Sequence, residues 1–152
     1  MVRELRVTPI RNGTVIDHIP PGMGLRVLEI ILAERDINRT ISLAMNVPSR
    51  RNKKKDIVKV EDVELTPFEL GKIALIAPDA TINIIRDYEV VEKRKVELPD
   101  TVLGILRCPN PNCITNQREP VTPEFRVLSR KPIRLRCVYC EREVANVIES
   151  LV

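Results

Sequence analysis

Short apolar runs rich in β-branched residues recur along the first two thirds of the chain, and turn-forming residues separate them. Runs of this length and composition are typical of β-strands with at least one buried face. The runs that we predict to be strands are Leu5–Ile10, Thr14–Ile19, Thr40–Met45, Asp56–Val63, Thr81–Arg86 and Tyr88–Lys95.

Two intervening segments have helical patterns instead. Apolar residues recur every three or four positions over Met23–Ala33, which predicts a helix with one buried face. A second helix is predicted after Thr66, because Pro67 suits the first helical position and Glu69 completes a capping box before Pro78 ends the helix. The order β-α-β-β-α-β with one extra strand predicts an α+β fold whose N-terminal domain is ferredoxin-like.

All four cysteines of the chain lie near its C-terminal end in two close pairs, Cys108 with Cys113 and Cys137 with Cys140. Two such knuckles can present four thiolates to one tetrahedral metal ion, which predicts a structural Zn²⁺ site. Paired disulfides are the first alternative, but no apolar secretory segment follows Met1. A redox Cys-x-x-Cys motif is the second, and it leaves one pair of cysteines without a role.

The run Leu98-Pro99-Asp100 suits a hinge between two domains, predicted over residues 1–99 and 100–152. A domain of fewer than ~60 residues buries little apolar surface, so the metal must contribute much of its folding free energy. Short apolar runs predict that the second domain is small and mainly β. In this domain Thr101–Arg107 leads into the first pair of cysteines, and the predicted strands are Glu124–Leu128 and Ile133–Arg136.

Composition restricts the possible functions. The chain has 152 residues, a formal net charge of +4, and no apolar stretch long enough to cross a membrane, so we expect a cytoplasmic protein. With one histidine and every cysteine assigned to the metal, no nucleophilic catalytic set is available, so an enzyme is not expected.

The basic run 50–55 supports one alternative function, a zinc-knuckle nucleic-acid-binding protein. Two Phe, two Tyr and no Trp leave such a protein few rings for stacking on bases.

Polar residues interrupt several of the apolar strands: Asp17 and His18 in one, Lys59 and Asn83 in two others, and Lys93 in the last. Each of them alone is typical of the exposed face of a half-buried strand. Together they form a set that suits a ribose and a polyphosphate, because carboxylate, imidazole and ammonium groups can bind hydroxyls and anionic oxygens.

Several longer motifs also point to a family. Among them are Arg11–Pro20, Asn46–Ser49, Lys55–Lys59, Asp87–Val91 and Cys108–Ile114. In these motifs and their order, the chain resembles the regulatory chain of aspartate carbamoyltransferase over nearly its whole length. The resemblance implies a nucleotide-binding allosteric domain followed by a zinc domain that contacts the catalytic chain, and it implies neither a nucleic-acid nor a membrane partner.

The resemblance also implies the ligands and site residues. The effectors would be CTP and ATP, with UTP as a further candidate, and one structural Zn²⁺ would be bound per chain. The partners would be the catalytic chain and a second regulatory chain. Asn110, Asn112 and Glu141 would contact the catalytic chain. The residues implied to bind the nucleotide are Ile10, Asp17, His18, Lys55, Lys59, Asn83, Ile85, Tyr88, Val90 and Lys93.

Within this set, the resemblance implies separate roles. Asp17 and one lysine would bind the ribose and base, whereas His18 and Lys93 would face the phosphates. Main-chain groups near Tyr88 and Val90, together with that of Ile10, would contact the edge of the base.

Overall fold

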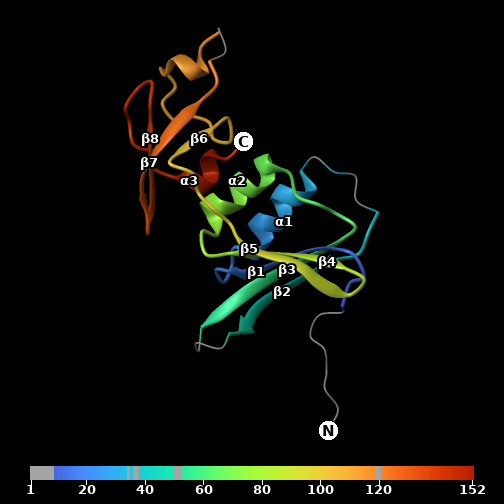
Figure 1. The fold of residues 1–152 in the computed structure, drawn as a ribbon. Coiled ribbons are helices and arrows are strands. Elements are labelled where there is room, and N and C mark those ends of the chain that lie inside the picture. The colour runs from blue at the N-terminus through green and yellow to red at the C-terminus, as the bar shows by residue number, and fades with distance from the viewer. Residues whose placement is uncertain (1–8, 34, 36–37, 50–52, 119–120) are drawn as a thin grey trace. The chain divides into compact units, whose positions relative to one another are not determined.

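A computed structural model describes residues 9–33, 35, 38–49, 53–118 and 121–152 of the chain. The chain divides into two compact units, an N-terminal unit, Met1–Val96, and a C-terminal unit, Glu97–Val152 (Figure 1). Among the described residues, no helix is both long enough and apolar enough to span a bilayer.

The N-terminal unit is built on a five-stranded antiparallel sheet with the strand order β2-β3-β1-β4-β5. This order places β1 between β3 and β4, as in a ferredoxin-like fold with one added edge strand. The α+β prediction is therefore confirmed. The strands are β1 (Gly13–Ile19), β2 (Ile41–Pro48), β3 (Lys54–Glu61), β4 (Thr81–Arg86) and β5 (Glu89–Lys95).

Two helices, α1 (Gly24–Leu32) and α2 (Pro67–Ile76), cover one face of this sheet (Figure 1). Alternation along the strands sends Ile16, Val58 and Ile82 into the core, and all three are almost completely buried. We call the opposite face of the sheet the open face, and among the described residues no helix of this unit lies on it. Residues next to these three in sequence, including Val15 and Asn83, therefore project from the open face.

The predicted capping box of α2 is present. The Glu69 backbone N–H donates to the Thr66 hydroxyl over 3.2 Å, and the Glu69 carboxylate accepts a hydrogen bond of 2.9 Å from the Thr66 backbone N–H. Pro67 lies in the first turn, where the absence of an N–H group costs nothing. The start of α2 is thus fixed by local sequence.

Two predicted strands differ in extent from the described structure. Most of the predicted strand Leu5–Ile10 lies outside the described residues, and Pro9 and Ile10 are not in a strand. The prediction ended a strand at Met45, whereas β2 continues to Pro48. A bulge accommodates Asn46 with φ of 58°, and the edge position of β2 tolerates the proline.

The C-terminal unit has a three-stranded antiparallel sheet with the order β6-β7-β8. Phe125, Leu106 and Leu135 are fully buried and form its small core. The segment Thr101–Arg107, which leads into the first pair of cysteines, begins with a short strand, and Gly104 follows with a left-handed φ of 75°. The elements are β6 (Thr101–Leu103), the 3-10 helix η1 (Ile114–Asn116), β7 (Glu124–Arg130), β8 (Ile133–Cys137) and α3 (Val147–Ser150).

Candidate functional sites: a four-cysteine centre and a polar cavity

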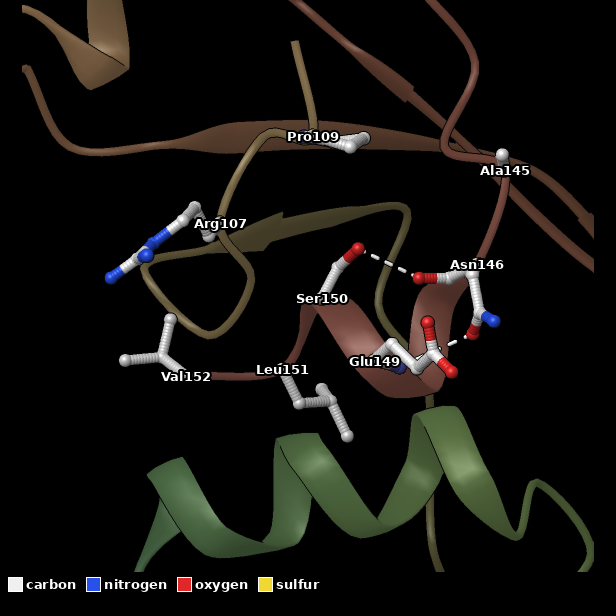
Figure 2. Close-up of a pocket in the computed structure, with 8 residues that line it drawn as sticks. All are labelled: Arg107, Pro109, Ala145, Asn146, Glu149, Ser150, Leu151 and Val152. Carbon is white, nitrogen blue, oxygen red and sulfur yellow. Dashed lines mark hydrogen bonds between the residues drawn. The ribbon is translucent and has the colours of Figure 1, made fainter. Parts of the chain in front are cut away.

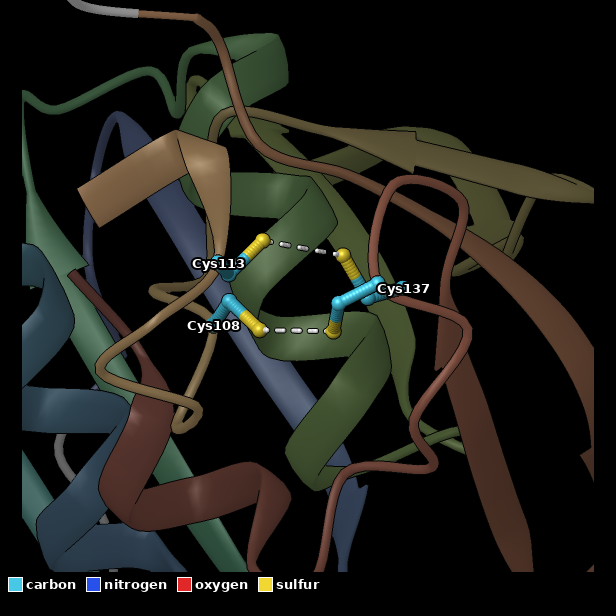
Figure 3. Close-up of side chains that lie close together, drawn as sticks. Cys108, Cys113 and Cys137 are labelled. Atoms are coloured by element: carbon cyan, nitrogen blue, oxygen red, sulfur yellow. Dashed lines mark hydrogen bonds between the residues drawn. The ribbon is translucent and has the colours of Figure 1, made fainter. Parts of the chain in front are cut away.

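The four cysteine sulfurs converge in the C-terminal unit. Cys108 and Cys113 come from the loop after β6, Cys137 ends β8, and Cys140 lies in the turn that follows it. The sulfur atoms lie within 4.8 Å of one another, and the Cys108–Cys140 and Cys113–Cys137 separations are 3.6 and 3.7 Å (Figure 3). A tetrahedron with metal–sulfur bonds of about 2.3 Å has edges of about 3.8 Å, so the cluster has the dimensions of a four-thiolate site.

Local hydrogen bonds shape the first knuckle. The carbonyl of Asn110 accepts from the backbone N–H of Cys113 at 3.1 Å, and the Asn110 side chain accepts from Asn112 N–H at the same distance. The side-chain amide of Asn116 donates to the carbonyls of Cys108 and Asn110 at 2.8 and 2.7 Å. The two asparagines therefore close the loop and hold both sulfurs on one side of it.

The second knuckle is a tight turn at the end of β8. The backbone N–H of Glu141 donates to the carbonyl of Cys137 at 2.9 Å, and Cys137 N–H donates to the carbonyl of Arg142 at 3.0 Å. Glu141 has φ of 63°, so the chain reverses there in a left-handed conformation. Glu141 is exposed at this turn, beside the cluster.

The thiols differ in acidity. Burial raises the pKa of Cys108 to about 12. Burial also acts to raise the pKa of Cys140, but hydrogen bonds, led by one from the backbone of Arg142, outweigh it and lower the pKa to about 7. At Cys113 the effect of burial is outweighed by Thr115, whose hydroxyl donates to the sulfur at 3.2 Å and helps lower the pKa. Because metals bind thiolates, metal binding must displace protons, above all from Cys108.

A polar cavity of about 340 Å³ lies on the open face of the N-terminal sheet. Its wall combines apolar and aromatic groups with two ammonium groups, one carboxylate and one amide, a mixture typical of sites for small polar ligands. The lining residues come from β1, β3, β4, β5 and the segment before β1. They are Pro9, Ile10, Val15, Asp17, Lys59, Asn83, Ile85, Tyr88, Val90 and Lys93.

The charged side chains of this cavity come from three strands, with Asp17 on β1, Lys59 on β3 and Lys93 on β5. Burial lowers the pKa of Lys59 on β3, which is partly desolvated. Lys93 on the exposed edge strand β5 lies directly opposite Asn83 of β4 in the register. The Asn83 amide donates to the carbonyl of Val15 at 3.4 Å, which orients the side chain.

The turn between β4 and β5 brings an aromatic ring to the cavity. Asp87 and Tyr88 have φ of 48° and 67°, typical of a tight hairpin turn. The backbone N–H of Tyr88 donates to the carbonyl of Arg11 at 2.9 Å, and Asp87 N–H donates to the Asn12 side chain at 3.2 Å. The turn is thereby tied to the segment that carries Ile10.

Two family models match the chain. The model of the aspartate carbamoyltransferase regulatory chain, allosteric domain, matches residues 5–97, and that of the metal binding domain of the same chain matches residues 100–149. The chain belongs to this family. It is therefore a non-catalytic regulatory chain, and its four-cysteine cluster lies in the metal-binding domain.

Curated relatives agree over nearly the full length, and all are named aspartate carbamoyltransferase regulatory chain. The one from Pyrococcus abyssi is 60% identical over 140 residues, which is 91% of each chain. That from Thermofilum pendens is 56% identical over 155 residues, covering 100% of this chain and 98% of the relative. That from Methanothrix thermoacetophila is 55% identical over 146 residues, covering 96% and 95%.

The cavity of the regulatory chain gathers eight of the ten residues predicted to bind the nucleotide, all except His18 and Lys55. Lys55 lies beside it, with its ammonium nitrogen 2.9 Å from a carboxylate oxygen of Asp17, which does line the cavity. His18 sits in a bulge of β1 with φ of 58°, and its Nδ1 lies 3.1 Å from the hydroxyl of Thr81.

Sequence reasoning missed two residues of the cavity wall, Pro9 and Val15. Val15 precedes Asp17 by two positions, so strict alternation along the strand places both side chains on the same face. That signal was present in the sequence. Pro9 had no such signal, because it lies outside any strand.

A second cavity, of about 550 Å³, lies in the C-terminal unit around α3 and contains none of the predicted site residues (Figure 2). The polar groups of Asn146 and Ser150 are used within the helix: the Asn146 side chain accepts from the Glu149 N–H at 3.2 Å, and the Ser150 hydroxyl donates to the Asn146 carbonyl at 2.7 Å. The other lining residues are Arg107, Pro109, Ala145, Leu151 and Val152.

Proposed function

We propose that residues 1–99, the predicted N-terminal domain, bind CTP and ATP as allosteric effectors, with UTP as a further candidate ligand. In the same proposal, residues 100–152 hold one structural Zn²⁺ and dock on the catalytic chain, and regulatory dimers link catalytic trimers in the cytoplasm. The observation that carries the effector proposal is the cavity of the open face, where two ammonium groups and a carboxylate meet apolar walls.

The chemistry of the cavity supports a division of roles. Lys59 and Lys93 are proposed to bind the phosphates, because ammonium groups form charge-assisted hydrogen bonds with phosphate oxygens. Asp17 is proposed to accept hydrogen bonds from ribose hydroxyls. Main-chain groups near Ile10, Tyr88 and Val90 are proposed to contact the edge of the base, and Ile85 and Asn83 complete the wall.

The two predicted residues beside the cavity have weaker support as direct contacts. Lys55 is proposed to act through Asp17, since their ion pair holds the carboxylate in place. His18 follows Asp17 in the bulge of β1 and stays in the proposal as a phosphate contact, although it does not line the cavity.

Zn²⁺ is the proposed metal because soft thiolate ligands in a tetrahedral arrangement favour it and the sulfur separations match its bond lengths. Four protein ligands leave no open coordination position, so the role of the ion is structural. When bound, the ion cross-links the loops that follow the two outer strands, β6 and β8, both of which end beside the start of β7.

The surface around the knuckles is the proposed contact with the catalytic chain. Asn112 and Glu141 are exposed there, as are the apolar side chains of Ile114 and Tyr139, about half of whose surface is accessible. Exposed apolar groups with a polar rim are typical of protein interfaces. Asn110 is buried within its loop, so its proposed contribution is to shape the contact surface.

The alternative prediction, nucleic-acid binding, depended on the basic run 50–55. Residues 50–52 lie outside the described residues, and Lys55 at its other end is paired with Asp17. The alternative therefore gains no support from this segment, and we do not favour it.

The proposal is tested by reconstituting the regulatory chain with catalytic trimers and measuring carbamoyltransfer with and without CTP or ATP. Allosteric coupling typically amounts to about 1–3 kcal/mol, which shifts the apparent substrate affinity by roughly 5- to 150-fold. We expect a shift in the reconstituted complex and none in the bare trimer. An assembled complex whose substrate response is unchanged by saturating CTP and ATP would show that the effector assignment is wrong.

A further inference from the structure

We propose that Asp56, a residue outside the cavity, is a positioning residue that fixes Lys55 and, through it, Asp17 of the effector site. This inference rests on the proposed function for its consequence in nucleotide binding, but the contacts that carry it are independent of any ligand.

Asp56 is a fully buried carboxylate that accepts three backbone hydrogen bonds. One oxygen accepts from the N–H groups of Gly22 and Gly24, and the other accepts from the N–H of Asn46, each at 2.9 Å. Hydrogen bonds to an ionised acceptor are stronger than neutral ones, and a buried acceptor that loses its partners is costly. Asp56 on β3 therefore holds two other segments, the start of α1 and the bulge of β2.

The first segment is the start of α1. Its N-cap residue, Met23, makes no side-chain capping bond, so the Asp56 carboxylate supplies the acceptor that the cap lacks. The fit is close: a Cβ atom on Gly24 would lie 2.9 Å from both Cβ and a carboxylate oxygen of Asp56 and 2.8 Å from a methyl group of Leu43. The glycine thus allows the helix terminus to approach the carboxylate.

Irregularities in both neighbouring strands flank Asp56 as well. In β1 the register with β3 shifts between Ile16 and Ile19, and Ile19 pairs with Asp56 itself. In β2 the register shifts between Ala44 and Val47, beside Asn46. Bulges change the direction of side chains and must be stabilised by specific contacts. By binding Asn46 and α1, Asp56 fixes β3 at the point where both neighbours deviate.

Strand alternation carries this constraint to the other face of the sheet. Asp56 points to the helices, so the adjacent Lys55 points to the open face. The Lys55 ammonium nitrogen lies 2.9 Å from Asp17, and each side chain of the pair is only about a fifth exposed. Asp17 lies in the bulged part of β1 and lines the cavity. The position of the Asp17 carboxylate therefore depends on β3 being held at Asp56.

The test compares the wild-type chain with Asp56→Asn, in which one hydrogen-bond acceptor is replaced by an amide donor that faces backbone N–H groups. Ile73→Val is the control for destabilisation, because Ile73 is fully buried in α2 and lies away from the cavity wall. Both variants are studied well below their unfolding temperatures, with stability measured by urea denaturation.

The first measurement needs no nucleotide. The rates at which an amine-reactive reagent modifies Lys55 and the exposed Lys95 are followed by mass spectrometry. We expect Lys55 to react several-fold faster in Asp56→Asn, because its ion pair with Asp17 loosens, whereas Lys95 keeps its rate and Ile73→Val changes neither. An unchanged Lys55 rate in Asp56→Asn, or the same increase in Ile73→Val, would overturn the positioning role.

The second measurement is calorimetric titration with CTP. Affinity should fall by about tenfold in Asp56→Asn, and Asp56→Asn combined with Lys55→Met should bind no more weakly than Lys55→Met alone, because both changes act through Asp17. Additive losses in this cycle would contradict the route through Lys55. If the wild-type chain binds no nucleotide, the effector proposal fails, and the labelling rates still decide whether Asp56 positions Lys55.

Discussion

Removal of the two cavity lysines one at a time gives the sharpest test of the proposed effector site. Lys59→Met and Lys93→Met each keep an unbranched apolar side chain and remove one ammonium group from the cavity wall. A hydrogen bond to a charged group contributes about 1.5–3 kcal/mol, which corresponds to a change in Kd of roughly 12- to 160-fold.

We expect the two lysines to contribute at different ends of this range of binding free energies. Lys59 lies on an inner strand, and burial lowers its pKa, so a phosphate there meets a partly desolvated charge and loses more when it is removed. Lys93 lies on the exposed edge strand β5, where water and salt screen the interaction. We expect Kd for CTP to rise about 100-fold in Lys59→Met and about tenfold in Lys93→Met.

Calorimetric titration with CTP and with cytidine separates phosphate contacts from base contacts. Affinity for cytidine should change little in either variant, and Lys95→Met, on the same strand as Lys93 but outside the cavity wall, should bind CTP as the wild type does. Because phosphates favour the ammonium form, CTP binding at alkaline pH should take up protons and weaken as pH rises through the lowered pKa of Lys59. Equal losses for CTP and cytidine would refute the assignment of these lysines to the phosphates.

Three further outcomes are expected. Cys113→Ser should lower the zinc content, measured by elemental analysis, below one ion per chain. The C-terminal sheet of this variant should unfold while CTP binding persists. Full zinc occupancy in the variant would contradict a four-cysteine site. The Arg134 side chain donates a hydrogen bond to Glu143 and lowers the pKa of this carboxyl group in the folded chain. The pair therefore stabilises the folded chain at a pH above the pKa that Glu143 has in the unfolded chain. This stabilisation is lost as pH falls through the lower pKa of the folded state. NMR titration should show the Glu143 midpoint rising in Arg134→Gln, and an unchanged midpoint would count against the pair. Thr66→Ala should lower the free energy of unfolding by about 1 kcal/mol in urea, because it removes one side of the capping box; no change would mean that water replaces the cap.

The parts of the fold that follow from local sequence could be predicted. The capping box at Thr66, the β-branched runs in the strands of the N-terminal sheet and the spacing of the cysteines each encode their structure within a few neighbouring residues. The strand pairing then followed from the order of elements, because a β-α-β-β-α-β chain has few ways to form one antiparallel sheet.

The irregular features could not be predicted in the same way. The bulges in β1 and β2 depend on contacts with β3, which is distant from β1 in sequence, and the extension of β2 through Asn46 contradicts the local preference of that residue. The placement of His18 shows the consequence. Simple alternation cannot tell where its side chain points once a bulge interrupts the strand, and the structure places it against Thr81 instead of in the cavity wall.

Asp17 and Asp56 illustrate what the fold adds to the sequence. Asp17 interrupts an apolar run and Asp56 precedes one, and nothing in their immediate neighbours separates a proposed effector contact from a structural anchor. The sheet separates them: Asp17 faces the open side and pairs with an ammonium group, whereas Asp56 faces the helices and binds only backbone N–H groups among its described hydrogen bonds. Since β3 carries Lys55 and Asp56 in succession, one strand connects the helix layer to the cavity. If the proposed effector site is correct, a buried residue outside the cavity therefore determines how tightly the effector is held.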